Sequence, residues 1–295
     1  MLKVFYHPLY TDGIDPQARF PRDRYRLLAE RLMQHPEIEL HEPRQATLDE
    51  LKLAHDCAYV ERFVSGTLTE KEIRTIGLKP WTADIVPRTL HLTGGSLEAL
   101  EHVLSYGGVA GNLAGGTHHA FRDSGAGYCI FNDIAVCALK ALDTQGINSV
   151  MVLDLDVHQG DGTAAMLAQH PNIFTCSIHG AKNFPFRKQQ SDLDIELADD
   201  AGDFEYLNAL DRVLQDHPFE RFDLVLFQAG VDALGSDRLG RLAVTREGMA
   251  QRNERVFAAA KKAGVPLVVL MGGGYSEPIE KSVDAFEDLF TAAAR

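Results

Sequence analysis

Short apolar runs alternate with helical patterns along most of the 295 residues, and this order is the feature that most constrains the fold. The runs are rich in Val, Leu and Ile without polar alternation, which is typical of strands buried on both faces. The sequence therefore predicts a parallel sheet covered by helices on both sides, an α/β fold of three layers, in one domain spanning 1–295. The expected strands are Val4–Tyr6, Gly108–Leu113, Ser149–Leu155, Ile173–Ile178, Leu224–Phe227 and Pro266–Met271. The expected helices are Asp23–Gln34, Asp56–Ser65, Pro87–Ser105, Asn132–Asp143, Gly162–Gln169, Asp203–Gln215, Thr245–Ala263 and Glu277–Ala293.

Polar side chains and glycines follow five of the six expected strands. The segments are "AGGTHHAF", "DVHQGDG", "HGAKNFPF", "QAGVDALGSD" and "GGGYSEP". The carboxyl ends of parallel strands meet at one edge of a sheet, where ligands bind in open α/β folds. We expect these five segments to form a single site.

The run "VLDLDVHQGDG", residues 152–162, places two aspartates and a histidine in what otherwise resembles a buried strand. Strand alternation puts Asp154, Asp156 and His158 on one face, with the outer pair about 13 Å apart, too far for one ion to bind all three. Asp156 and His158 could bind one metal ion at the strand end, with Asp154 supporting the site from one step deeper. The alternative is a buried Asp–His hydrogen-bonding network without an ion.

Other strand ends offer partners for such a metal. A zinc hydrolase site usually has three protein ligands and one open position, and Asp232 is the best third ligand, unless it caps a helix or turn. His118 and His119 follow a glycine pair, and each could be oriented for acid–base chemistry by a spare carboxylate, Asp154 or Asp161. Tandem histidines are otherwise typical of solvated loops.

A tyrosine and the overall composition complete this interpretation. Tyr275 follows three glycines and could donate a hydrogen bond to a developing oxyanion. The net charge of -13 repels phosphate backbones, which argues against nucleic-acid binding and is compatible with basic substrates. The four cysteines form no C-x-x-C pair, which favours a reducing, cytoplasmic setting. We find neither a signal peptide nor an apolar run long enough for a membrane span.

Taken together, "GGTHHA", "GYCIFND", "DLDVHQGDGT", "SIHGAKNFP", "QAGVDAL" and "MGGGY" resemble the zinc-dependent histone deacetylase superfamily, which has the arginase–deacetylase fold. Upstream, "DPQARFPRDRYRLL" and "HDCAYVERF" resemble the N-terminal segments of that family. The stretches "FPRDRYRLL", "KNFPFRK" and "SDRLGRLAVT" are most similar to bacterial and class IV-like members.

The resemblance implies a role for each motif residue. It implies zinc ligands at Asp156, His158 and Asp232, a principal general base at His119 paired with Asp161, an electrostatic partner at His118 paired with Asp154, and a carbonyl-polarising phenol at Tyr275. It implies an acyl-lysine tunnel walled by Tyr128 and Phe184, with the Gly127 carbonyl facing the substrate amide. It also implies a structural monovalent cation, usually potassium, at a set comprising Asp154, Asp156, His158, Ser177 and Ile178. The sequence departs from the common family pattern at two positions. Gln159 stands where many members have a histidine, and Tyr128 stands where a phenylalanine is common.

The expected function is hydrolysis of an N-acyl amide in an acylated lysine peptide or a small acylated amine. The expected cofactor is Zn²⁺, and Fe²⁺ suits the same donor set. One alternative is a non-catalytic binder of acyl amines or short-chain acids. Another is an arginase-like ureohydrolase with two manganese ions, which would need a D-x-D pair that Asp232 lacks. The same machinery suits acetyl-lysine, acetylpolyamines and longer acyl chains.

Overall fold

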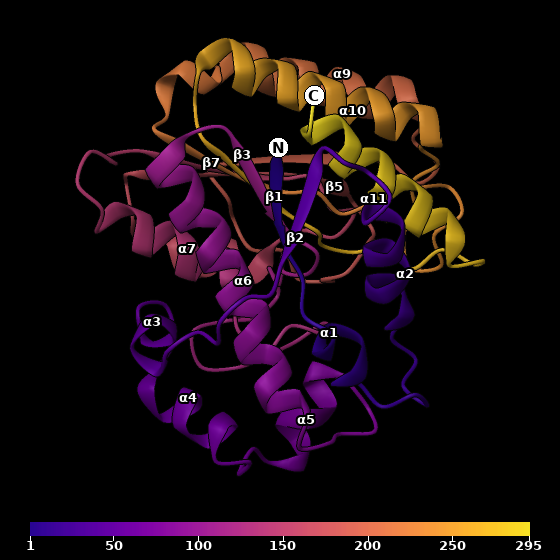
Figure 1. Ribbon diagram of the computed structural model, residues 1–295. Coiled ribbons are helices and arrows are strands. Elements are labelled where there is room, and N and C mark those ends of the chain that lie inside the picture. Colours follow the sequence, from indigo (N-terminus) through magenta and orange to yellow (C-terminus); the bar gives the residue numbers. More distant parts are fainter.

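The computed structural model describes residues 1–295 and contains one eight-stranded sheet (Figure 1). The strand order is β2-β1-β3-β8-β7-β4-β5-β6, and every neighbouring pair is parallel. The strands are β1 Leu2–Phe5, β2 Ile38–His41, β3 Val109–Asn112, β4 Val150–Asp154, β5 Ile173–Gly180, β6 Leu193–Leu197, β7 Leu224–Gln228 and β8 Leu267–Leu270.

Helices cover both faces of this sheet. On one face α2, α11, α10 and α9 pack side by side in that order, and α6, α7 and α8 pack together on the other (Figure 1). The three-layer α/β/α architecture predicted from the sequence is therefore confirmed. The helices are α1 Leu9–Asp12, α2 Asp23–Leu32, α3 Leu48–Lys52, α4 Cys57–Val64, α5 Glu70–Ile76, α6 Ile85–Tyr106, α7 Asp133–Leu142, α8 Asp161–Leu167, α9 Asp203–Asp216, α10 Arg246–Ala263 and α11 Glu280–Ala293, with a 3₁₀ turn, η1, at Phe219–Arg221.

All six expected strands are present within two residues of their predicted ends, but the sequence prediction missed two strands. Both missed strands, β2 and β6, form the outer edges of the sheet. Their sequences, "IELH" and "LDIEL", alternate with charged residues and are only partly buried. The short helices α1, α3 and α5 were also missed, and α11 begins at Glu280, three residues later than expected, beyond Pro278.

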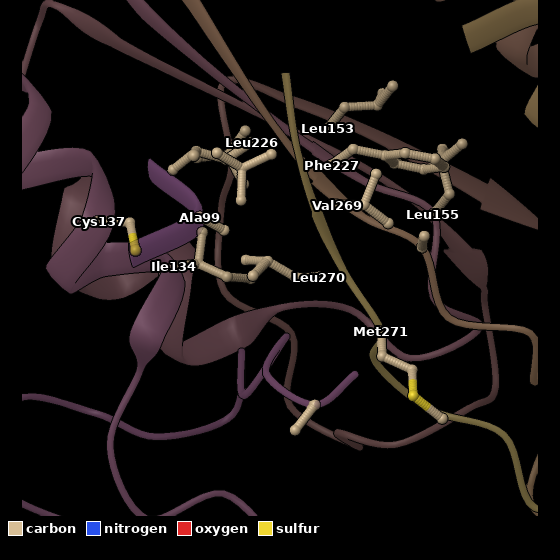
Figure 2. Packing of buried hydrophobic residues seen from close by; sticks show 14 of the residues in the cluster. Ala99, Ile134, Cys137, Leu153, Leu155, Leu226, Phe227, Val269, Leu270 and Met271 are labelled. Carbon is tan, nitrogen blue, oxygen red and sulfur yellow. The ribbon is translucent and has the colours of Figure 1, made fainter. Parts of the chain in front are cut away.

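The apolar core is centred on the strands in the middle of the sheet. Leu153 of β4, Phe227 of β7 and Val269 of β8 are completely buried, as are Ile134 and Cys137 of α7 (Figure 2). Burying one such large apolar side chain contributes roughly 1.5–3 kcal/mol. This packing holds the central strands in place, and it therefore also holds the ends of those strands in place.

Two further observations concern the helices and the cysteines. No helix of the structure combines the length and the hydrophobicity that crossing a membrane would require. The four cysteines are unpaired, with Cys57 exposed and the other three buried.

Candidate active site

The five segments that carry polar motifs follow β3, β8, β7, β4 and β5, which are consecutive in the sheet. Because these strands are parallel, their carboxyl ends lie side by side, and the segments surround one cavity of about 1130 Å³. The cavity is lined by His118, His119, Asp156, His158 and Tyr275, and by the tunnel residues Gly127, Tyr128 and Phe184. The structure thus brings the predicted site residues together at the expected edge.

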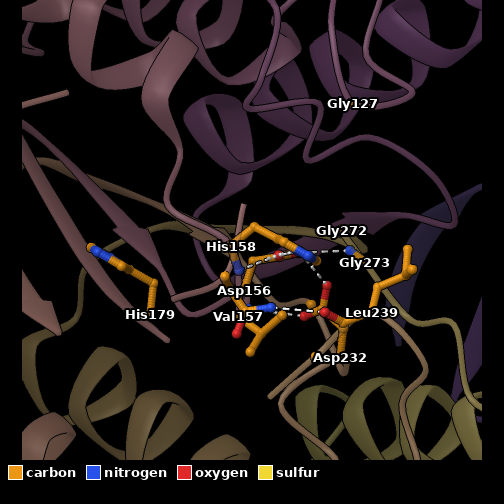
Figure 3. A network of polar contacts seen from close by, with 12 residues as sticks. Gly127, Asp156, Val157, His158, His179, Asp232, Leu239, Gly272 and Gly273 are labelled. Atoms are coloured by element: carbon orange, nitrogen blue, oxygen red, sulfur yellow. Dashed lines mark hydrogen bonds and ion pairs between the residues drawn. The ribbon is translucent and has the colours of Figure 1, made fainter. Parts of the chain in front are cut away.

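The three predicted metal ligands form a compact buried group (Figure 3). Nδ1 of His158 lies 3.0 Å from Oδ1 of Asp156 and 3.1 Å from Oδ2 of Asp232. The reason given by strand alternation is wrong, because β4 ends at Asp154 and both Asp156 and His158 lie in the following loop. The loop is instead fixed by hydrogen bonds, since the Val157 N–H donates to Oδ1 of Asp232 at 2.9 Å. Asp232 therefore contacts this loop and does not cap a helix.

Further donors hold the first carboxylate in place. Oδ2 of Asp156 accepts hydrogen bonds from the Gly273 N–H at 2.7 Å and from Nε2 of Gln228 at 2.9 Å. The His158 N–H donates to the other oxygen, Oδ1, at 3.0 Å. Asp156 is therefore oriented by groups at the ends of three different strands.

Two carboxylates buried side by side give this group a need for positive charge, which a proton or a bound cation can meet. Burial and the charge of Asp156 raise the pKa of Asp232 to about 7. Burial disfavours a charged His158, but its contacts with Asp156 and Asp232 outweigh burial and raise its pKa to about 10. Nδ1 of His158 lies 3.0 and 3.1 Å from the two carboxylate oxygens, close to the separation of about 3.4 Å between the ligands of a tetrahedral zinc ion. One imidazole and two carboxylates therefore match zinc, and ferrous iron also accepts this set.

Each tandem histidine is paired with a different aspartate. Nδ1 of His118 lies 2.7 Å from Oδ2 of Asp154, and Nδ1 of His119 lies 2.7 Å from Oδ1 of Asp161. Both histidines are buried, so the solvated-loop interpretation is wrong. Asp156, His158 and Asp232 form one group with metal-ligand spacing, whereas the two manganese ions of an arginase would need a second such group.

The two histidines differ in protonation. Burial disfavours a charge on His118, but Asp154 and Asp156 outweigh burial and raise its pKa to about 9. Burial and the neighbouring charge of His118 lower the pKa of His119 to about 4. At neutral pH His118 is therefore cationic, whereas His119 is a neutral acceptor.

The first residues of α7 hold the histidine loop. The Asp133 carboxylate accepts hydrogen bonds from the backbone N–H groups of Gly116 at 3.2 Å and Thr117 at 2.8 Å. Gly115 and Gly116 have φ of 81° and 71°, a region that favours glycine. The motif "GYCIFND" thus contains a positioning residue, Asp133, to which the sequence analysis gave no role.

Aromatic rings form the tunnel walls. The Phe184 ring lies 4.8 Å from the His119 ring, and the Tyr128 ring lies 6.0 Å from the Tyr275 ring. Gly127 packs so closely on His119 that a Cβ there would meet its ring, and its carbonyl accepts a hydrogen bond from Cys129. The sequence analysis missed Phe20, whose ring lies 5.2 Å from that of Tyr128.

A buried arginine on α2 supports Tyr275, and it was also missed. Arg24 donates to the carbonyl oxygens of Gly272 at 2.9 Å and Gly274 at 3.0 Å, and its guanidinium lies 5.5 Å from the Tyr275 ring. Burial raises the pKa of Tyr275 well above its ordinary value, which keeps the phenol protonated and able to donate. No local pattern could place Arg24 here, because it is about 250 residues away in sequence.

The residues expected to bind a monovalent cation share Asp156 and His158 with the metal group, and the other three, Asp154, Ser177 and Ile178, lie on β4 and β5. Asp154 of β4 pairs with Ser177 of β5, and Oγ of Ser177 lies 2.9 Å from Nδ1 of His179. The potassium site stays a prediction. Gln159, at a position where a histidine is common in the resembling family, donates to Oδ1 of Asp194 at 2.8 Å and connects the metal loop to β6.

Comparisons with known proteins identify the family. The model of the histone deacetylase domain matches residues 17–289. The chain is 41% identical over 295 residues to an uncharacterized protein of Picosynechococcus sp., covering 98% of this chain and 97% of that protein. It is 29% identical over 262 residues to a histone deacetylase-like amidohydrolase of Pseudomonas aeruginosa (81% and 67% covered) and 34% identical over 188 residues to histone deacetylase 2 of Arabidopsis thaliana (62% and 48% covered). The match therefore spans only about half of the Arabidopsis protein. Because the family model covers most of the chain, this protein belongs to the histone deacetylase family of hydrolases.

Proposed function

We propose that this protein is a zinc-dependent deacylase that hydrolyses the amide bond of an acylated lysine side chain or a related acylated amine. The observation that carries the proposal is the Asp156–His158–Asp232 group beside His119 and Tyr275 in one cavity. These three residues would hold a zinc ion, which would supply a Lewis acid and lower the pKa of water to about 7. We include a structural potassium ion near Asp154 and Ser177 in this proposal.

Proton transfer is assigned to His119. Its Nδ1 faces Asp161 at 2.7 Å, so Nε2 of the neutral ring is free to accept a proton from water. The same nitrogen then returns that proton to the leaving amine. His118, cationic beside Asp154, adds positive charge next to the reacting centre.

The remaining residues bind and orient the substrate. The hydroxyl of Tyr275 donates to the oxygen that becomes negative in the tetrahedral intermediate. The rings of Tyr128 and Phe184 are suited to hold the apolar stem of an acyl-lysine and to exclude water around it. Binding energy along the stem thereby positions the amide for attack.

A chelation and reconstitution experiment tests the proposal. Protein stripped of metal is assayed on lysine peptides with different acyl chains and on acetylated amines, before and after one equivalent of zinc is added. We expect activity to vanish with the metal and return with zinc. Zinc-loaded protein that hydrolyses none of these amides would contradict the proposal and favour a binder of acyl amines.

A further inference from the structure

The mouth of the cavity is positively charged, although the whole chain carries a net charge of -13. Five exposed basic residues line it, and the only carboxylate in the lining is that of the buried metal ligand Asp156. The five are Arg19, Lys79, Lys182, Arg238 and Arg241. A protein that is acidic overall therefore presents cations where a substrate must enter.

These cations come from four segments of the chain. Arg19 precedes α2, Lys79 follows α5, and Lys182 follows β5. The other two lie on the loop after β7. Asn183 joins the segment after β5 to the loop after β7. Its Nδ2 donates to the Leu239 carbonyl at 2.8 Å, and its Oδ1 accepts from the Arg241 N–H at 3.2 Å. The five cations are thus attached to elements that also bear or border the site.

Acidic neighbours cancel only part of this charge. Lys182 and Arg241 share Asp199, each at 3.3 Å, and Arg238 contacts Glu277 at 3.3 Å. Arg19 and Lys79 have no acidic partner within 4.0 Å. Five positive charges therefore face two negative ones. Exposed ion pairs are worth at most about 1 kcal/mol, so the paired side chains can also exchange partners with a ligand.

Apolar side chains stand among the cations. Phe186 is 89% exposed and Leu239 is 44% exposed, and both line the same cavity. Leu239 lies close to the metal group in Figure 3. The mouth of the cavity therefore offers apolar contacts as well as charge to the residues that flank an acyl-lysine in a peptide.

Given the deacylase function proposed above, we infer that the substrate lysine lies in an acidic peptide sequence. Carboxylates flanking the acyl-lysine contact the cations at the mouth, while a polybasic tail is repelled. Because the cations lie on four different segments, several carboxylates along a chain can engage them, whereas one small anion reaches only some. Complementary charge acts mainly on the rate of encounter and on specificity. We therefore expect the charge of the peptide to change KM, and the size of that change to depend on salt concentration.

Three acetyl-lysine peptides of equal length test this inference with the zinc-loaded protein. They carry acidic, neutral or basic residues around the same acetyl-lysine, and free Nε-acetyl-lysine serves as a fourth substrate. We expect kcat/KM to fall by about tenfold from the acidic to the basic peptide, through KM, with a smaller difference at high salt. Equal or reversed preference among peptides that are cleaved would overturn the inference and leave the deacylase proposal standing. Free acetyl-lysine matching the acidic peptide would also overturn it. Absence of any turnover would overturn both.

Charge-reversed variants locate the effect at the mouth. Arg19→Glu and Lys79→Glu should each lower kcat/KM for the acidic peptide about threefold to tenfold and raise it for the basic one, with little change for the neutral peptide. Arg212→Glu is the matched control, because Arg212 is also exposed, has no acidic partner, and lies in the second half of α9, outside the cavity lining. If Arg212→Glu shifts the preference as far as Arg19→Glu does, overall charge is responsible and the inference fails.

Discussion

At the scale of single residues, Gly273 shows how little space surrounds the proposed metal ligands. A Cβ at this position would overlap the Asp232 carboxylate, although the backbone conformation itself suits alanine. We predict that Gly273→Ala weakens zinc binding by at least about tenfold, as expected when the surroundings of metal ligands are disturbed. Isothermal titration with zinc measures this.

The matched control for that variant is Gly202→Ala. A Cβ at Gly202 would have no neighbour closer than 3.9 Å, and its backbone also suits alanine. Zinc affinity should stay unchanged there. Wild-type affinity in Gly273→Ala would show that Asp232 does not bind the ion from the position seen in the structure.

Tyr275 carries the second prediction at this scale. Tyr275→Phe should lower kcat by roughly 10²–10³, as the loss of one oxyanion donor does in other hydrolases. The fold should be retained, because only a hydroxyl is removed. Tyr106→Phe, at an 81% exposed tyrosine, serves as the control. The role assigned to Tyr275 is wrong if its variant turns over substrate at the wild-type rate.

At the scale of elements, α2 and the loop after β8 are coupled through Arg24. Arg24→Met leaves the Gly272 and Gly274 carbonyls without this donor, which should lower the free energy of unfolding by about 3 kcal/mol. It should also lower kcat, because Tyr275 loses its support. Arg26→Met, an exposed substitution on the same helix, should do neither.

A double variant separates positioning from general damage. If Arg24 acts through Tyr275, adding Arg24→Met to Tyr275→Phe should reduce kcat by less than it does in the wild type. Fully additive effects on log kcat would show that Arg24 does not act through the phenol.

His55 connects the segment before α4 to α7 and makes stability depend on pH. Its Nε2 accepts a hydrogen bond from the Asn132 N–H at 2.8 Å, and burial lowers its pKa to about 4. The unfolded chain, with a His pKa near 6.5, binds this proton more readily, so stability is complete above pH 6.5 and is lost as pH falls toward 4. The contribution is about 3 kcal/mol.

Chemical denaturation at several pH values tests this. His55→Gln should show a smaller decrease in unfolding free energy between pH 6.5 and 4 than the wild type. Comparing the two slopes removes the contributions of other buried histidines. Identical slopes would mean that His55 does not titrate as described.

The elements also show what the sequence can predict. Fully buried strands such as β4 and β7 have a continuous apolar pattern and were predicted, whereas the edge strands β2 and β6 are half-exposed and lack one. Residues that directly follow a central strand, such as Asp232, could be assigned to the site. Phe20 and Arg24 could not, because tertiary packing alone brings α2 and its preceding loop to the cavity.

At the scale of the whole molecule, charge distribution matters more than net charge. A value of -13 is compatible with basic substrates, yet the cavity mouth carries an excess of cations. The sequence lists the charges without their positions, so only the folded chain shows Arg19 and Arg241 at the same opening. A surface that is acidic elsewhere would repel anions from the rest of the molecule.

The whole account depends on one divalent ion being bound by Asp156, His158 and Asp232. Mass spectrometric metal analysis of protein loaded with zinc and then dialysed measures this directly, with Asp232→Asn beside the wild type. We predict one zinc ion per chain in the wild type and less than one in Asp232→Asn. Two ions per chain, none, or full occupancy in Asp232→Asn would contradict the account.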